Sequence, residues 1–258
     1  MKKIFNAFLA LAMVITAGMT LTSCSKEDNS LPDNTTSDIE RQRLEEWKPC
    51  NKLTYISGIE SENPDLQAVI RQHLESGADA VGMVLTPGFR RSVPLSRAAR
   101  MASMVPEGIL AVGVFVDTPA EEVALVARSL GLGAVQLHGS EDEAYLSRLR
   151  ELSDVMTIKS FIVGSADDIR KAEASSADLV LLDSGRGSGR ALDWSKIGQL
   201  GRRTVLAGGL TPGNVGEAVI KVHPYAVDVS SGIETDGVKD ADKMKAFREN
   251  VERADREA

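Results

Sequence analysis

The sequence predicts an α/β protein folded as a single (β/α)8 barrel, the TIM barrel. Short apolar runs alternate with amphipathic helical patterns from residue 53 onward, and repeated strand–helix order favours a parallel sheet. Most of the runs are continuously apolar, as expected for strands that are buried on both faces. Eight such units fit the 258-residue length, because one barrel of this class typically fills about 250 residues.

The predicted strands alternate with helices whose apolar side chains recur on one stripe, as in residues 64–76 and 120–130. In this fold the active site lies at the C-terminal ends of the strands, so the residues that finish the strands are the candidate functional residues. The predicted strands are Leu53–Ser57, Ala80–Leu85, Leu110–Val116, Ala134–His138, Thr157–Val163, Leu179–Asp183, Thr204–Gly208 and Ala226–Ser230.

The segment before the barrel divides into residues 1–24 and 25–51. Residues 1–24 combine a basic start with a short apolar run, which is typical of a secretory signal. They end at Leu21-Thr22-Ser23-Cys24, which resembles the lipobox of bacterial lipoproteins and implies a lipidated Cys24 anchored to the bacterial envelope. A buried or amphipathic N-terminal helix is the alternative. Residues 25–51 are polar and predict a linker, and residues 52–258 predict the barrel.

Composition limits the partners of the protein. The net charge of −7 argues against a nucleic-acid partner, which would need a basic patch. It is compatible with a phosphorylated small molecule, because backbone amides and helix N-termini can hold phosphate. The barrel segment contains no cysteine and the three histidines are scattered. Neither a cysteine zinc site nor a histidine metal cluster is therefore predicted.

Glycine- and serine-rich segments follow the last two predicted strands, at residues 206–212 (LAGGLTP) and 228–232 (DVSSG). Barrels of this class frequently bind phosphate with these two loops, and glycines let backbone amides approach an anion. Ordinary turn chemistry is the alternative, but the two segments together favour a phosphate site. The predicted phosphate-binding residues are Gly208, Gly209, Ser230, Ser231 and Gly232.

Asp183 ends an apolar strand and should therefore lie at the mouth of the barrel. Partial burial there would suit its carboxyl group to act as a general acid near neutral pH. A helix N-cap, or an ion pair with Arg186 or Arg190, explains the same residue equally well on spacing alone.

Short motifs follow one another along the barrel, and their order and spacing resemble those of the phosphoribosylanthranilate isomerase family of tryptophan biosynthesis. The similarity covers nearly the whole barrel. The motifs are Gly113-Val114-Phe115-Val116, Gln136-Leu137-His138-Gly139, Leu182-Asp183 with Gly187-Ser188-Gly189, Asp193-Trp194, residues 206–212, residues 228–234 and Gly237-Val238-Lys239-Asp240.

The resemblance implies an Amadori rearrangement of N-(5-phosphoribosyl)anthranilate that needs no metal and no organic cofactor. A general acid opens the furanose ring, and a general base then removes the C2 proton. By position, Asp183 matches the general acid, and Arg91 matches the arginine near the anthranilate carboxylate. The two glycine-rich segments match the phosphate-holding loops. His138 is expected to organise the site rather than to act as the base.

The first predicted strand departs from the family pattern, because Ser57 stands where the family carries the cysteine that acts as general base. A thiol titrates near about 8.5 and can be poised as a thiolate, whereas a serine hydroxyl needs an adjacent base. Ser57 is therefore the predicted catalytic partner of Asp183 in a weakened isomerase. Ser92 also stands where an aromatic residue is common after the arginine.

Two other interpretations stay open. A lipoprotein signal would carry the barrel out of the cytoplasm, where the tryptophan pathway operates. The protein would then be a non-catalytic envelope barrel that binds a sugar phosphate or another anion. The aminoaldose isomerase of the histidine pathway is the third interpretation, and it would be expected to carry an acidic residue where Ser57 stands.

Overall fold

The computed structural model describes residues 53–56, 66–185, 194, 197 and 200–258. Cys24 and Ser57 lie outside these residues, as do Arg186 and Arg190. The signal and linker at residues 1–51, the lipidation of Cys24 and the role of Ser57 therefore stay predictions from the sequence.

Eight parallel strands form a closed barrel in chain order. The ring closes where β1 pairs with β8, with Leu53 opposite Ala226 and Ile56 opposite Val229. This arrangement confirms the predicted (β/α)8 barrel. The strands are β1 (Leu53–Ile56), β2 (Ala80–Val84), β3 (Leu110–Phe115), β4 (Ala134–Leu137), β5 (Met156–Ile162), β6 (Leu179–Asp183), β7 (Thr204–Leu206) and β8 (Ala226–Val229).

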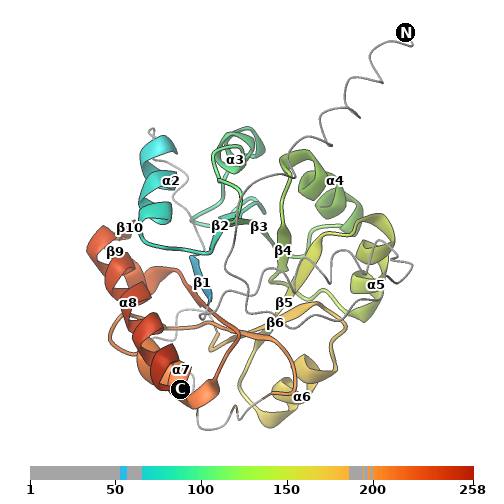
Figure 1. Cartoon of the computed structure of the whole chain (residues 1–258). Coiled ribbons are helices and arrows are strands. Elements are labelled where there is room, and N and C mark those ends of the chain that lie inside the picture. Colours follow the sequence, from blue (N-terminus) through green and yellow to red (C-terminus); the bar gives the residue numbers. More distant parts are fainter. Residues whose placement is uncertain (1–52, 57–65, 186–193, 195–196, 198–199) are drawn as a thin grey trace, which may run out of the picture. The chain divides into compact units, whose positions relative to one another are not determined.

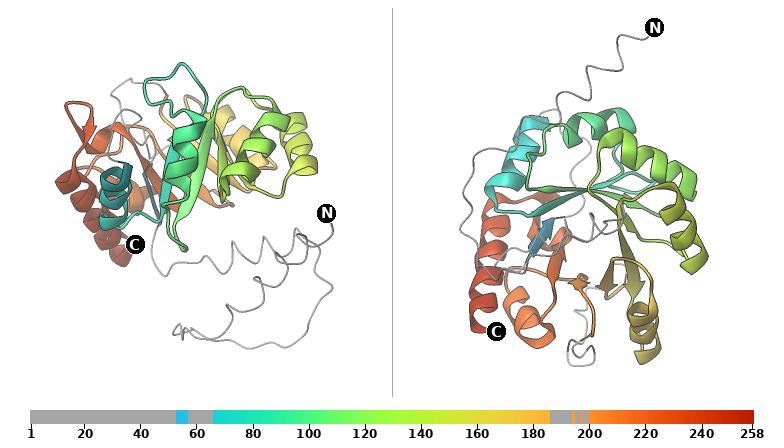
Figure 2. Two further views of the ribbon diagram at one scale, coloured as in Figure 1. Left: turned by 90° about the horizontal axis from the view of Figure 1, so that it is seen from above. Right: turned by 45° about the vertical axis from the view of Figure 1, so that its right-hand side comes forward.

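Helices follow the strands and surround the barrel (Figure 1), and α8 lies beside α7 (Figures 1 and 2). The segment between β6 and β7 falls largely outside the described residues. The helices are α2 (Leu66–Glu75), α3 (Leu95–Ala102), α4 (Ala120–Leu130), α5 (Glu143–Leu152), α6 (Ala166–Ala174), α7 (Val215–Val222) and α8 (Ala241–Glu257). Between β8 and α8 lie the 3-10 turn η2 (Ser231–Ile233) and an antiparallel hairpin of β9 (Glu234–Thr235) and β10 (Val238–Lys239).

Two apolar clusters explain why the strands are apolar along their whole length. In β6, Leu181 belongs to a small cluster made of residues in and beside the strands. Its neighbours Val180 and Leu182 belong to the larger cluster, to which the helices contribute residues such as Phe247 of α8. Because successive side chains of a strand point to opposite faces, one face of each strand fills the barrel and the other packs against helices.

No helix within the described residues is both long enough and apolar enough to span a bilayer.

Candidate active site

Asp183 is the last residue of β6, at the C-terminal face of the barrel. Its side chain is 22% exposed, so the carboxylate can meet a small molecule. Oδ1 accepts a hydrogen bond from the backbone N–H of Gly185 at 2.9 Å, and Oδ2 lies 3.7 Å from Nε2 of His138. The structure therefore places the predicted acid beside the residue that follows β4.

His138 is held by Gln136, two residues earlier on β4. Nε2 of Gln136 lies 2.9 Å from Nδ1 of the imidazole. An amide N–H donated to Nδ1 leaves the proton of the neutral ring on Nε2, which is the nitrogen that faces Asp183. Gln136 was not singled out by the sequence analysis, although it belongs to one of the motifs quoted there.

A buried ion pair supports the loop that carries His138. Nζ of Lys159 lies 2.8 Å from Oε2 of Glu141, with side-chain exposures of 6% and 1%. The same carboxylate accepts hydrogen bonds from the backbone N–H groups of Asp117 and Gly139, at 2.8 and 2.9 Å. Hydrogen bonds from Ser140 in turn lower the pKa of Asp117. These contacts fix the ends of β3, β4 and β5 relative to one another.

The loop after β7 packs directly against the predicted acid. Gly208 and Gly209 both have a positive φ, at 82° and 68°, a backbone conformation that favours glycine. A Cβ atom on Gly208 would lie 2.8 Å from Oδ1 of Asp183 and 2.4 Å from the backbone nitrogen of Ser184. Glycine is therefore required where the predicted phosphate loop approaches Asp183.

The loops after β7 and β8 also touch each other. A Cβ atom on Gly232 would lie only 1.7 Å from the carbonyl oxygen of Leu210. Asn214 secures the first loop, because its amide accepts from the N–H of Thr211 at 2.8 Å and donates to the carbonyl of Gly209 at 3.0 Å. The two predicted phosphate segments thus form one continuous surface.

Arg91 comes from the loop between β2 and α3, and Ser92 secures that loop. The hydroxyl of Ser92 donates to the carbonyl of Thr86 at 2.6 Å and accepts from the N–H of Phe89 at 2.9 Å. Nη2 of Arg91 lies 2.5 Å from Oε1 of Glu234, and the arginine side chain is 22% exposed. Ser92 stands where an aromatic residue is common in the family, and its hydrogen bonds are compatible with an ordered loop that presents Arg91.

Glu234 and Lys239 face each other across the β9–β10 hairpin. Asp236 and Gly237, which connect the two strands, have positive φ values of 53° and 81°. Nζ of Lys239 lies 3.2 Å from Oε1 of Glu234, with side-chain exposures of 1% and 7%. The sequence analysis assigned no role to this pair. The dipeptide Asp-Gly was the signal that could have predicted the hairpin, because it is typical of two-residue turns with positive φ.

Glu234 and Lys239 of this hairpin influence each other's pKa, and the nearby Arg91 influences the pKa of both. Burial lowers the pKa of Lys239 to about 8, although the charge of Glu234 opposes that shift. Burial alone would raise the pKa of Glu234, but the charges of Lys239 and Arg91 lower it on balance.

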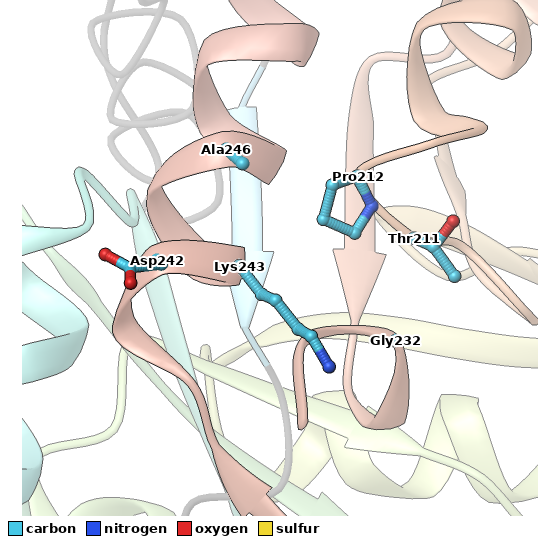
Figure 3. Close-up of a pocket in the computed structure, with 6 residues that line it drawn as sticks. All are labelled: Thr211, Pro212, Gly232, Asp242, Lys243 and Ala246. Carbon is cyan, nitrogen blue, oxygen red and sulfur yellow. The ribbon is translucent and has the colours of Figure 1, made fainter. Parts of the chain in front are cut away.

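A pocket lies beside the β8 loop (Figure 3). Lys243 reaches from α8 toward the loop around Gly232, whereas Asp242 points away from it. The pocket borders both predicted phosphate segments, because Thr211 and Pro212 belong to residues 206–212 and Gly232 belongs to residues 228–232. The residues that line it are Thr211, Pro212, Gly232, Asp242, Lys243 and Ala246.

Among the residues that the structure describes, no cluster of histidine, cysteine, aspartate and glutamate could hold a metal ion. The predicted acid, His138 and the β7 loop lie together at the C-terminal face, and Arg91 is joined through Glu234 to the segment that follows β8.

Comparison with known proteins identifies relatives of this chain. Residues 61–250 match the family model of N-(5'phosphoribosyl)anthranilate isomerase. The N-(5'-phosphoribosyl)anthranilate isomerase of Desulforudis audaxviator is 44% identical over 186 residues, which cover 69% of this chain and 89% of that protein. The enzyme of the same name from Bacillus cereus strain B4264 is 40% identical over 182 residues, covering 67% and 87%.

Solved structures that are similar to this chain carry the same enzyme name as the sequence relatives. The phosphoribosyl anthranilate isomerase of Thermotoga maritima is 36% identical and superposes with a TM-score of 0.68, covering 78% of this chain and 98% of that one. A phosphoribosyl anthranilate isomerase in complex with reduced 1-(o-carboxyphenylamino)-1-deoxyribulose 5-phosphate is 35% identical, with a TM-score of 0.66 and the same coverage.

Proposed function

The chain belongs to the N-(5'-phosphoribosyl)anthranilate isomerase family, and on that premise we propose that it isomerises N-(5-phosphoribosyl)anthranilate in tryptophan biosynthesis. The product is 1-(2-carboxyphenylamino)-1-deoxyribulose 5-phosphate. The observation that carries the proposal is the position of Asp183, which ends β6 between His138 and the glycine loop after β7. The family assignment favours this function over a non-catalytic barrel that binds an anion.

Asp183 acts as the general acid in this proposal. Its carboxyl group donates a proton to the furanose ring oxygen, the bond between that oxygen and C1 breaks, and the lone pair of the anthranilate nitrogen forms a protonated imine (iminium) with C1. A base then removes the C2 proton to give an enol amine, which becomes the ketone. Ser57 is the residue at the position of the cysteine that acts as the family's base. We assign Ser57 the removal of the C2 proton, as a weaker base than that cysteine.

His138 orients Asp183 rather than taking the C2 proton. Its Nε2 faces Oδ2 of Asp183, while its Nδ1 is held by Gln136. A ring fixed in this way favours one rotamer and one tautomer, and it therefore holds the carboxyl group toward the barrel mouth.

The substrate is bound at its two anionic ends. Its phosphate lies on the loops after β7 and β8, where the glycines of the first loop let backbone amides approach closely. Its anthranilate carboxylate lies at Arg91, whose planar guanidinium suits a carboxylate. The proposed phosphate residues are Gly208, Gly209, Ser230, Ser231 and Gly232.

Incubating the full-length protein with freshly generated N-(5-phosphoribosyl)anthranilate tests the proposal. We expect NMR to show the signals of the ketose product growing in proportion to protein concentration. A folded protein that produces no ketose would contradict it.

A further inference from the structure

We propose that Glu234 is a positioning residue that holds the guanidinium of Arg91 ready for the anthranilate carboxylate. The inference rests on the proposed function and extends it, because it names the residue that positions Arg91 for the carboxylate-bearing ring.

The contact between the two side chains is short and shielded. Oε1 of Glu234 lies 2.5 Å from Nη2 of Arg91, and the glutamate side chain is only 7% exposed. A guanidinium carries five N–H donors, so a bond through Nη2 leaves donors for a second carboxylate. Because an exposed arginine loses rotamer freedom when it binds, an arginine already held by Glu234 binds at a smaller entropic cost.

Glu234 is itself fixed from several sides. Its side chain meets Nζ of Lys239 at 3.2 Å, and its backbone carbonyl accepts from Nζ of Lys243 at 2.7 Å. Lys239 also donates to the carbonyl of Ser230 at 2.7 Å. The residue that holds Arg91 is thus connected to the proposed phosphate loop, so the two anion-binding ends of the site are kept at a set separation.

Arg90 provides an internal comparison. It contacts the other carboxylate oxygen of Glu234 at 3.1 Å, but its side chain is 61% exposed. An exposed ion pair of this kind contributes little free energy, so Arg90 can be removed without displacing the Glu234–Arg91 pair.

A purely structural role for Glu234 would be to balance the buried charge of Lys239. Losing that balance would weaken folding and would affect all ligands alike. A positioning role instead changes the preference between ligands that differ only in the carboxylate, and this difference separates the two roles.

The test measures binding of two compounds by calorimetry. One is reduced 1-(2-carboxyphenylamino)-1-deoxyribulose 5-phosphate, and the other is the same compound made from aniline, which lacks the carboxylate. For the wild-type protein we expect a preference of about tenfold or more for the first, the range of a charge-assisted hydrogen bond. Glu234→Gln should reduce that preference about fivefold, without weakening the binding of inorganic phosphate.

Three further variants make the result specific. Glu234→Asp keeps a negative charge in the hairpin but withdraws the carboxylate oxygen that Arg91 and Lys239 share, so it should also reduce the preference, even if Glu234→Gln does not fold. Arg90→Met should keep the preference. In an Arg91→Met background, Glu234→Gln should cause no additional loss.

A preference that is unchanged from the wild type in folded Glu234→Gln and Glu234→Asp proteins would overturn the role of Glu234 while leaving the isomerase assignment intact. A wild-type protein that binds both compounds equally would overturn the substrate assignment, and the role of Glu234 with it.

Discussion

At the scale of single residues, the side chains that end the strands could be predicted, and their partners could not. Asp183 follows four buried apolar residues in the sequence, so its place at the barrel mouth was predictable. Its neighbour His138 follows β4, 45 positions earlier, and the 3.7 Å approach of the two side chains depends on how β4, β5 and β6 are staggered. Glu234 had no such signal, because its contact with Arg91 spans 143 positions.

Ser57 carries the residue-scale prediction. Ser57→Cys should raise turnover at least about tenfold, because a thiolate is a far better base than a serine hydroxyl and general bases contribute about 10²–10⁴-fold. Steady-state rates at saturating substrate, with Ser57→Ala as the control, measure the effect. A rate that does not change in the cysteine variant would mean that another group removes the C2 proton.

At the scale of elements, the positions of strands and helices followed the sequence closely, since residues 120–130 were predicted to be helical and α4 spans Ala120–Leu130, whereas the capping of the helices depends on tertiary contacts. Pro119 occupies the N-cap of α4 and makes no side-chain capping bond, and the hydroxyl of the preceding Thr118 lies 3.1 Å from that of Thr86. By contrast, Asp142 and Ser165 do cap α5 and α6. A side chain near a strand end has partners on the neighbouring strand, and such tertiary contacts compete with local capping.

The contact between the β7 and β8 loops gives the element-scale prediction. In Gly232→Ala the new methyl group would collide with the carbonyl of Leu210, so the loop must move. A displacement of this kind should weaken phosphate affinity about tenfold or more, as measured by calorimetry with inorganic phosphate.

Gly213→Ala is the matched control for that experiment. It lies in the β7 loop segment, and the nearest atom to its added Cβ is Oγ1 of Thr211 at 3.8 Å, an ordinary contact. Equal phosphate affinities for the two variants would show that the close approach at Gly232 does not shape the site.

At the scale of the whole barrel, closure depends on the meeting of the first and last parts of the fold. Continuous apolar runs predicted parallel strands, yet no local signal specified that β1 pairs with β8. Arg248 of α8 helps to secure this region, since it pairs with Asp79, which also accepts the N–H of Thr54 on β1 at 2.8 Å. Asp79 precedes β2 and therefore lies at the N-terminal face, where contacts serve stability.

Arg248→Met tests that role. We expect the free energy of unfolding in urea to fall by about 2 kcal/mol, with ligand affinity unchanged because the active site lies at the opposite face. Arg253→Met, which removes an exposed arginine from the same helix, should change neither quantity. A loss of ligand affinity in folded Arg248→Met would contradict the separation of the two faces.

The most direct test of the isomerase assignment is the turnover of N-(5-phosphoribosyl)anthranilate, followed by loss of anthranilate fluorescence, in wild-type and Asp183→Asn proteins of equal stability. The account predicts measurable turnover in the wild type and a loss of about 10²-fold or more in the variant, because the amide cannot protonate the ring oxygen. Equal rates in the two proteins, or none in a folded wild type, would contradict it.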